Sequence, residues 1–474
     1  MHNSIQHFAG FGINNMEKVV KKFLEEPKNF ASFVLGLRDE ALNLVLDIIS
    51  ETLTNCNKMI IDSEERKKNW HIVRTDTKQL ITSVGTVTFE KTLFKNKKTG
   101  KRVYLLDKQL GIEDHERMTE DAEALLLEEA AQTSYKKAGE GISILETVSK
   151  QTVKDKVHSL VFPRNDYAGE KKAVDYLYID ADEDHVAMQG TENNHSTIVK
   201  MVYVHEGIEP ETPGGKRKRL INPHYFCGVY GDKANKKLWD EVYLYLEQHY
   251  DLTKVKKIYL NGDGGNWIKA GANLIEGIEY VLDGFHLEKY LLRITRCLRI
   301  GETEVRKEIL AYIKEDKRAE LKNFIRKVTD GTETEADAKR MLESFDYILN
   351  NWKAARARVC ADEHVLACTA EGHVSHVLSS RMSSRPMAWS PTGMDAMAKL
   401  RAYMLNYGNM LELVRLQRKG VPVEDNEIIL SAKDMLEVEN KSRNRYGKYF
   451  DNIQYHLSDQ LRKKLWLQHK IALY

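Results

Sequence analysis

The chain contains 474 residues, of which 42% are hydrophobic and 30% are charged, and this balance excludes a wholly disordered protein. Its 72 basic and 70 acidic side chains leave a net charge of only +2, so affinity for nucleic acid has to come from local clusters of charge. No apolar run approaches the roughly 20 residues of a membrane helix, and the five scattered cysteines are typical of a reducing compartment. We therefore expect a soluble cytoplasmic protein with no membrane partner.

The first part of the chain predicts helices followed by a β-hairpin. Residues 1–64 carry apolar side chains at helical spacing, and residues 81–89 are rich in β-branched side chains. Residues 101–106 are expected to return as a partner strand, which makes residues 65–112 a β-hairpin region. The tip of this hairpin is basic, and we expect its five cations to contact DNA phosphates: Lys95, Lys97, Lys98, Lys101 and Arg102.

Residues 113–165 are expected to be helical and to contain a helix-turn-helix that binds DNA. Glycines would loosen the turn, and Ser149 would cap the second helix. Valines at helical spacing would face inward on that helix. The outward positions would then reach into a DNA groove: Lys150, Gln151, Lys154 and His158.

Residues 166–290 alternate strand and helix signals. Three β-rich runs come first, then a helix, and then two further strands separated by a helical crossover. This order predicts an α/β fold, an RNase H-like catalytic domain with a mixed sheet and flanking helices. The helical spacing that begins at Leu287 predicts an all-helical insertion over residues 291–368. Residues 369–415 would complete the catalytic domain, and residues 416–474 would form a C-terminal helical tail.

Two aspartates follow predicted strands of this domain. Asp180 closes the first apolar run, and Asp263 lies in a glycine-rich turn after another strand. Because the carboxyl ends of neighbouring strands converge on one edge, we expect the two carboxylates to share divalent cations. Asp182 and Asp184 are rivals of Asp180, since strand alternation puts all three on one face. From the residues alone, turn-forming aspartates explain the pattern as well.

Four stretches of sequence carry a resemblance to a known family. They are residues 178–185, 259–268, 282–290 and 371–386. In this order they resemble the ISLre-type bacterial insertion-sequence transposases, a family long catalogued as uncharacterised and similar to Mutator-like DDE transposases. The resemblance covers nearly the whole chain.

By position, the resemblance implies a catalytic and metal-binding triad of Asp180, Asp263 and Glu371, with Glu363 and Asp362 as rivals of Glu371. It implies two Mg²⁺ or Mn²⁺ ions and metal-dependent strand cleavage and strand transfer. The implied partners are double-stranded DNA, both the element's ends and its target, and further copies of the chain in a homo-oligomer on DNA. Such a protein would associate with the nucleoid when bound to DNA. The alternatives are an RNase H-like nuclease that does not transpose and an inactive, transposase-derived DNA-binding protein.

Other side chains near the triad complete the prediction. Asp182 and His286 are expected to support the site, and Arg381 and Arg385 to clamp phosphates. A zinc site is the rival interpretation of Cys360, His364 and Cys368, which would form a row if a helix carried them and which His373 or His376 would complete. The spacing matches no close-spaced zinc motif, so we expect ordinary buried cysteines.

Overall fold

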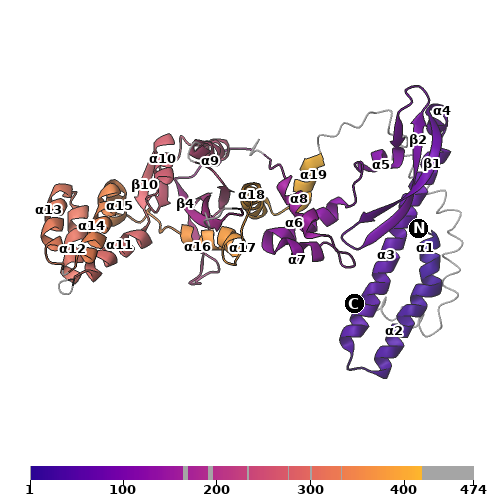
Figure 1. Ribbon diagram of the computed structural model, residues 1–474, viewed down its shortest axis with the longest axis horizontal. Coiled ribbons are helices and arrows are strands. Elements are labelled where there is room, and N and C mark those ends of the chain that lie inside the picture. Colours follow the sequence, from indigo (N-terminus) through magenta and orange to yellow (C-terminus); the bar gives the residue numbers. More distant parts are fainter. Residues whose placement is uncertain are drawn as a thin grey trace. The chain divides into compact units, whose positions relative to one another are not determined.

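The computed structural model describes residues 2–163, 169–190, 196–231, 234–275, 277–298, 302–332 and 334–418. These residues belong to two compact units (Figure 1). Of the described residues, one unit contains those up to Leu126, Glu140–Val148 and Arg418; the other contains Leu127–Gly139 and those between Ser149 and Gln417. None of the helices in these ranges is both long and apolar enough to cross a membrane. Beyond Arg418, the predicted C-terminal tail lies outside the described residues.

The first unit begins with helices, as residues 1–64 predict. They are α1 (His2–His7), the π-helical turn η1 (Phe8–Gly12), α2 (Ile13–Glu25), α3 (Phe30–Asp62) and α4 (Glu64–Asn69). Asn29 caps α3 by accepting the backbone N–H of Ser32 (3.4 Å). The helices α2 and α3 form an antiparallel hairpin in which the ring of Phe23 stacks on Phe33 with centroids 4.5 Å apart.

A three-stranded antiparallel sheet follows, in the order β1 (Trp70–Ile81), β2 (Thr86–Asn96) and β3 (Arg102–Tyr104). The predicted pairing of the basic hairpin is confirmed, since Lys95 is level with Arg102. The predicted strand over residues 81–89 is confirmed from Thr86 onward, where β2 begins, but a turn interrupts it at residues 82–85. The Thr82 hydroxyl donates to the Gly85 carbonyl (2.8 Å) and fixes that turn. The twelve residues before it, Trp70–Ile81, form the further strand β1.

Four short helices come next: α5 (Leu105–Leu110), α6 (Glu120–Gln132), α7 (Tyr135–Glu140) and α8 (Lys150–His158). The predicted cap of α8 is confirmed, because Ser149 Oγ accepts the N–H of Thr152 (3.2 Å). The outward orientation of His158 is wrong. The His158 ring packs closely on Gly393: a Cβ added at Gly393 would lie only 2.5 Å from His158 Nε2. Burial lowers the pKa of His158.

The second unit is built on a five-stranded mixed sheet in the order β10-β9-β4-β5-β8. Strands β4 and β5 are antiparallel, as are β5 and β8, whereas β4, β9 and β10 run parallel. The bounds are β4 (Tyr176–Ala187), β5 (Ser196–His205), β8 (His224–Gly228), β9 (Lys257–Gly262) and β10 (Ile278–Leu282). The five predicted strands of this region are thus confirmed, and β6 (Ile208–Pro210) and β7 (Lys218–Leu220) add a small hairpin that the sequence pattern does not predict.

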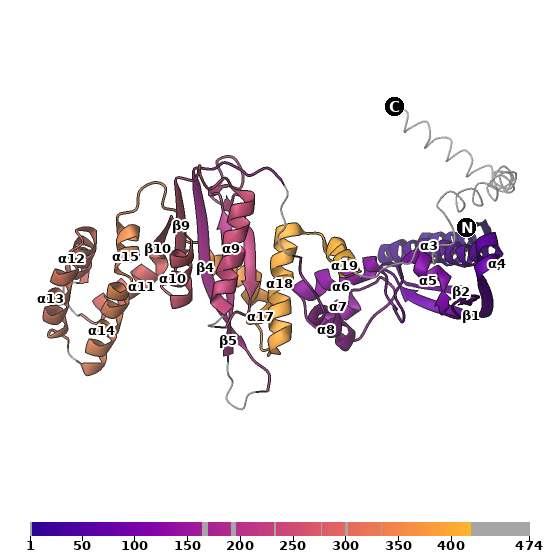
Figure 2. The same cartoon turned by 90° about the horizontal axis from the view of Figure 1, so that it is seen from above.

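Helices cover both faces of this sheet (Figure 2). On one face, α9 (Asn235–His249) and α10 (Asn266–Leu274) bury Trp239 and Ile268 against Leu177 and Ile179 of β4. Residues 370–382 cross the other face of β4. The helix α18 (Pro391–Tyr407) lies along the edge of the sheet, where the Asn406 side chain accepts the N–H of Tyr225 (2.8 Å) and donates to its carbonyl (2.8 Å). The short helix α19 (Met410–Arg418) ends the described chain.

Five helices separate β10 from the last part of the sheet unit. They are α11 (Gly284–Arg296), α12 (Glu302–Lys314), α13 (Arg318–Thr329), α14 (Glu335–Asn350) and α15 (Trp352–Val359). No strand interrupts the described residues of this span, as predicted. The expectation of a helix up to Cys368 is wrong, because residues 360–369 are irregular. Side chains of other elements take up their carbonyl groups: Arg358 donates to Leu366 (3.1 Å) and Tyr178 to His364 (2.9 Å).

Candidate active site

Asp180 lies in the middle of β4 and is fully buried. Asn261 donates to one carboxylate oxygen (2.8 Å), and the Tyr203 hydroxyl donates to the other (2.8 Å). The backbone N–H and the hydroxyl of Thr369 also donate to the second oxygen, at 3.0 and 3.2 Å. The predicted position of Asp180 at the end of a strand is wrong, because pairing with β5 continues to Ala187. Its carboxylate is therefore satisfied inside the protein.

Asp182 is the acid of β4 that lies near Asp263. The parallel register ends where Asp180 pairs with Asn261, and Asp182 and Asp263 each follow that pair by two residues; the charge of Asp263 acts on Asp182, so the two side chains lie near each other. Burial, and to a smaller extent the negative charge of Asp263, raises the pKa of Asp182 to about 6. A bound cation would relieve this unfavourable juxtaposition of two carboxylates.

The helical insertion holds the turn that carries Asp263. The hydroxyl of Tyr347 in α14 donates to the backbone carbonyl of Asp263, and Asp263 Oδ1 accepts the N–H of Gly265 (2.9 Å). Gly264 has φ +95°, and a Cβ there would lie 2.7 Å from the Asn351 amide nitrogen. The position therefore requires glycine both for its backbone conformation and for its close approach to the insertion.

A third carboxylate and a histidine lie near the turn that carries Asp263. Asp283 follows β10 and caps α11 by accepting the N–H of Phe285 (3.2 Å). Its other carboxylate oxygen contacts His286 Nδ1 (2.9 Å), and this bond raises the pKa of His286. The charges of Asp182 and Asp263 also act on His286. The predicted supporting residues thus lie together, and Asp283 joins them; its position directly after a strand was the signal that could have identified it.

Glu371 lies in a helical segment that crosses the face of β4 carrying the aspartates. This segment consists of α16 (Ala370–Val374), the π-helical turn η3 (Ser375–Ser379) and α17 (Ser380–Met382). It is attached at both ends, since Thr369 donates to Asp180 and Ser383 donates to Asp184 (2.7 Å). Glu371 occupies the first turn of α16 and is exposed. Its rivals Asp362 and Glu363 lie outside this segment, in the irregular stretch before it.

The structure separates the members of the hypothetical zinc set. Helix α15 ends before Cys360, so no helix carries Cys360, His364 and Cys368 in a row. Cys360 is exposed, the ring of His364 stacks on Tyr176 at 4.3 Å, and burial raises the pKa of the Cys368 thiol. Within the described ranges, no three histidine, cysteine or acidic side chains are placed to hold a metal ion. The donors at the end of the sheet are carboxylate oxygens, which suit hard cations such as Mg²⁺.

The two arginines expected to clamp phosphates have different surroundings. Arg381 is only 5% exposed, and its Nε donates to the Ala130 carbonyl (2.9 Å). Its guanidinium lies 4.8 Å from the centre of the Trp389 ring, and burial lowers its pKa to about 10. The burial of Arg381 in the packing of this unit argues against the expected phosphate contact. Arg385 is exposed.

The predicted DNA-contacting side chains of the other elements lie at the surface. All five cations of the hairpin tip are exposed: Lys95, Lys97, Lys98, Lys101 and Arg102. The Lys97 ammonium donates to the Lys67 carbonyl, which holds the tip against α4. On α8, Lys150 and Gln151 are exposed and Lys154 is half-buried. Gln151 donates to Asp155 (2.7 Å), so its amide is oriented along the helix.

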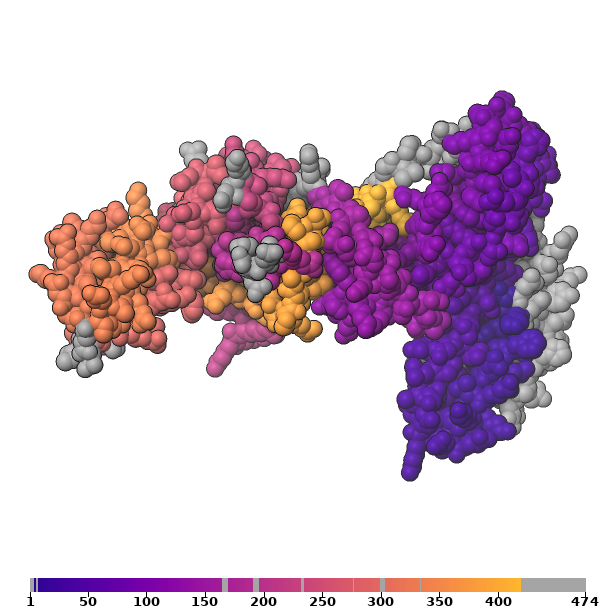
Figure 3. Space-filling model, in the orientation of Figure 1, coloured from indigo at the N-terminus to yellow at the C-terminus, as the bar shows by residue number. Residues whose placement is uncertain are grey.

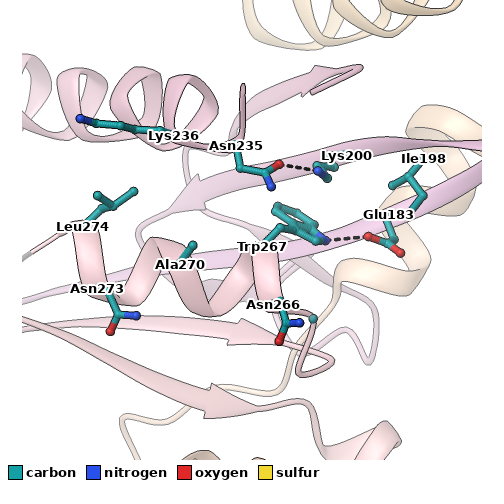
Figure 4. A pocket seen from close by; sticks show the side chains of 11 residues that line it. Glu183, Ile198, Lys200, Asn235, Lys236, Asn266, Trp267, Ala270, Asn273 and Leu274 are labelled. Atoms are coloured by element: carbon teal, nitrogen blue, oxygen red, sulfur yellow. Dashed lines mark hydrogen bonds between the residues drawn. The ribbon is translucent and has the colours of Figure 1, made fainter. Parts of the chain in front are cut away.

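The opposite face of β4 borders a cavity of about 650 Å³. Figure 4 shows the indole of Trp267 donating to Glu183 (2.6 Å), and the Lys200 ammonium donating to Asn235. These bonds connect β4 with α10 and β5 with α9. Glu183 therefore faces away from Asp182, and its contact with Trp267 fixes the strand from behind.

The fold is a mixed α/β architecture in which Asp263 and Asp283 directly follow the parallel strands β9 and β10, and Asp182 lies where β4 extends beyond its pairing with β9. The chain belongs to the family described as "Uncharacterised protein family (UPF0236)", whose model matches residues 24–420. Two relatives from Caldanaerobacter subterraneus subsp. tengcongensis, UPF0236 proteins TTE2489 and TTE0402, are each 33% identical over 414 residues. These matches cover 86% of this chain, and 86% and 81% of the relatives.

Among solved structures, the chain is similar to the Drosophila P element transposase strand transfer complex, at 12% identity and a TM-score of 0.19. The match covers 72% of this chain and 91% of that chain. At this TM-score, the similarity carries no argument about activity.

Proposed function

We propose that this protein is a DDE-type transposase that cleaves DNA strands at the ends of an insertion sequence and joins them to target DNA. The strand order supports an RNase H-like catalytic domain, because an antiparallel β8-β5-β4 meander continues into the parallel strands β9 and β10. The interrupting helices α11–α15, which come before the last acid, fit the arrangement that the resemblance to ISLre-type and Mutator-like transposases implies.

One observation carries the proposal: Asp182 and Asp263 each lie two residues beyond the last β4–β9 pair, Asp180 with Asn261, and burial together with the charge of Asp263 raises the pKa of Asp182 to about 6. We assign the first catalytic position to Asp182 in place of Asp180, whose oxygens are occupied by Asn261, Tyr203 and Thr369. Asp263 takes the second position, and Glu371 takes the third. Asp180 instead attaches the segment of Glu371 to β4.

Asp182, Asp263 and Glu371 would hold two Mg²⁺ or Mn²⁺ ions, although no three such side chains of the described residues are placed to hold a metal ion as the structure stands. Bound ions would lower the pKa of an attacking water or DNA 3′-hydroxyl and stabilise the leaving oxygen. The residues around them position this machinery. Tyr347 holds the backbone of Asp263, and Asp283 fixes the ring of His286 through Nδ1. The raised pKa of His286 favours its charged form, which places positive charge beside an incoming phosphate.

Double-stranded DNA is the proposed substrate. The exposed cations at the tip of the β2–β3 hairpin would contact phosphates, and Lys150, Gln151 and Lys154 of α8 would read the element's ends. Arg385 would contact phosphates near the catalytic edge. The protein would associate with the nucleoid through this DNA.

A cleavage assay on the purified full chain tests the proposal. The substrate is a supercoiled plasmid carrying the DNA that flanks the coding region, with Mg²⁺ or EDTA present. We expect cuts at the element's ends and joining of those ends to a target plasmid in Mg²⁺ alone. Asp182→Asn, Asp263→Asn and Glu371→Gln should each reduce cleavage by at least a hundredfold, since each removes a metal ligand.

Asp175→Asn is the matched control. Asp175 is an exposed acid just before β4 and is paired with Lys256 (2.8 Å), so its variant should cleave like wild type. Cutting at random sites without joining would instead identify a nuclease that does not transpose. Full cleavage by Asp182→Asn combined with loss of cleavage in Asp180→Asn would return the first position to Asp180.

A further inference from the structure

The hairpin of α2 and α3 carries more apolar surface than its own packing covers. None of residues 13–55, all of which the structure describes, is buried. Leu24 is 69% exposed and Phe30 61%, and further exposed apolar side chains are Val20, Val34, Leu35 and Val45. Among the described residues, α2 and α3 pack on each other, on the small sheet and on the short helices around them, and these contacts leave an outer apolar face exposed. A contiguous face of this kind marks an interaction site.

Four of these exposed side chains lie on one flank of the hairpin. The two helices contact each other through Val19, Phe23, Phe33 and Gly36. Val20, Leu24 and Val34 each follow one of these residues by one position, which turns them by about 100° around their helix. Because the helices run antiparallel, this equal turn brings all three to the same side. Val45 lies about three turns beyond Val34 and extends the stripe. We call these four residues the apolar flank; α2 and α3 are the indigo helices of Figure 1 and the indigo surface of Figure 3.

We propose that the apolar flank of one chain packs on the apolar flank of a second copy, so that two hairpins form a four-helix bundle. A second copy presents two antiparallel helices at once, which is what covering stripes on both α2 and α3 requires. It also presents the same flank, and the same patch meeting itself about a two-fold axis gives a closed dimer.

The charges beside the flank are complementary in this arrangement. Glu17 precedes Val20 by one helical turn, and Arg38 follows Val34 by one. Gly36 lies level with Val19, since a Cβ at Gly36 would meet Val19 at 2.9 Å. Because the helices are antiparallel, Glu17, two residues before Val19, lies level with Arg38, two residues after Gly36. With the two-fold axis parallel to the helices, each α2 faces the other copy's α3. Glu17 of each copy then faces Arg38 of the other, which gives two reciprocal ion pairs.

The intramolecular partner of Arg38 does not oppose this pairing. Arg38 donates to Asp39 (2.7 Å), but both side chains are about half exposed, at 46% and 48%. Exposed pairs of this kind contribute little to stability. Arg38 can therefore exchange Asp39 for a carboxylate of the second copy when the flank becomes covered.

Sedimentation velocity on the full chain, without DNA or metal, tests the proposal. We expect wild type to sediment as a dimer and Val34→Glu to sediment as a monomer, because the variant buries a charge in the bundle. Ser32→Glu is the matched control: Ser32 is exposed on the same helix but off the flank, and its variant should remain dimeric. Circular dichroism of both variants should match wild type. A monomeric wild type, as expected if residues 419–474 of the same chain cover the flank, would overturn the proposal, as would a dimeric Val34→Glu.

A charge exchange tests the arrangement itself. Glu17→Arg and Arg38→Glu should each raise the dissociation constant of the dimer by about tenfold. An equal mixture of the two variants should recover wild-type affinity, because each α2 then again faces an opposite charge. A mixture no tighter than either variant alone would overturn the proposed pairing. Since DNA is absent, the result is independent of the proposed transposase activity.

Discussion

At the scale of single residues, the raised pKa of Asp182 links the site to stability. The carboxyl has a pKa of about 6 in the folded chain and about 4 in an unfolded one. As the pH rises through this window, the unfolded chain releases the proton first and is favoured. We expect this group to lower the free energy of unfolding by about 3 kcal/mol between pH of about 4 and about 6, and to have no further effect above that.

Asp182→Asn should remove this pH-dependent loss, and urea titrations at several pH values in EDTA would measure it. Asp175→Asn serves as the control, since Asp175 is exposed and its variant should follow the wild-type profile. Parallel profiles for wild type and Asp182→Asn would contradict the assignment of this burial to Asp182.

The two arginines of the site region form a natural pair of variants. Arg381→Gln should lower the melting temperature, because it leaves the buried Ala130 carbonyl without its donor, a loss of about 2 kcal/mol. Arg385→Gln should leave the melting temperature unchanged and reduce the salt slope of DNA binding by about 0.9. Thermal melts and salt titrations of both variants check this. A stable Arg381→Gln with weakened DNA binding would restore the phosphate role that the burial of Arg381 argues against.

Residue patterns could not choose between Asp180 and Asp182. Both lie on the same face of one strand, and a period of two treats them alike. Only the register against β9, a contact some eighty positions away in the chain, brings Asp182 near Asp263. The sequence likewise does not show that Arg381 is buried between Tyr135 and Trp389, because this packing is a tertiary contact that leaves no local pattern.

At the scale of elements, the basic hairpin and α8 should act differently on DNA. Neutralising Lys98 or Arg102, which are exposed near the hairpin tip, should lower the salt slope of binding by about 0.9 each, with sequence preference unchanged. Gln151→Ala should instead reduce discrimination between end sequence and random DNA, since side chains on a groove helix read base edges.

Fluorescence anisotropy over a salt series, with both kinds of DNA, separates these effects. Glu113→Gln is a control that lies outside both elements and should change neither quantity. An unchanged salt slope after neutralisation of both hairpin cations would remove the hairpin from the interface.

The strands of the mixed sheet were predictable because they are short apolar runs bounded by turns. The strand before Thr82 was missed, although WHIVRTDTKQLI has high β-propensity, because its exposed residues alternate poorly with buried ones. The irregular stretch over residues 360–369 was missed for a different reason. Its geometry depends in part on the hydrogen bond from Tyr178, which is 186 residues away in the sequence and leaves no local signal.

At the scale of the whole molecule, the order of the segments was predictable and their grouping was not. The sequence order of helical region, hairpin, α/β domain and insertion appears in the structure. The chain nevertheless passes between the two units more than once, since Leu127–Gly139 belongs with Ser149–Gln417 while Glu140–Val148 belongs with the N-terminal unit. Such crossings depend on tertiary packing, which composition along the chain does not record.

The central claim is that Asp182 and Asp263 together hold the catalytic metal ions, and a metal-substitution assay tests it most directly. Asp182→Cys and Asp263→Cys replace a hard oxygen ligand by a softer sulfur, which disfavours Mg²⁺ more than Mn²⁺. Cleavage of end-containing plasmid DNA is measured for both variants and for wild type in each metal. We predict that both variants lose cleavage in Mg²⁺ and recover part of it in Mn²⁺, whereas wild-type cleavage in Mg²⁺ by either variant would contradict the account.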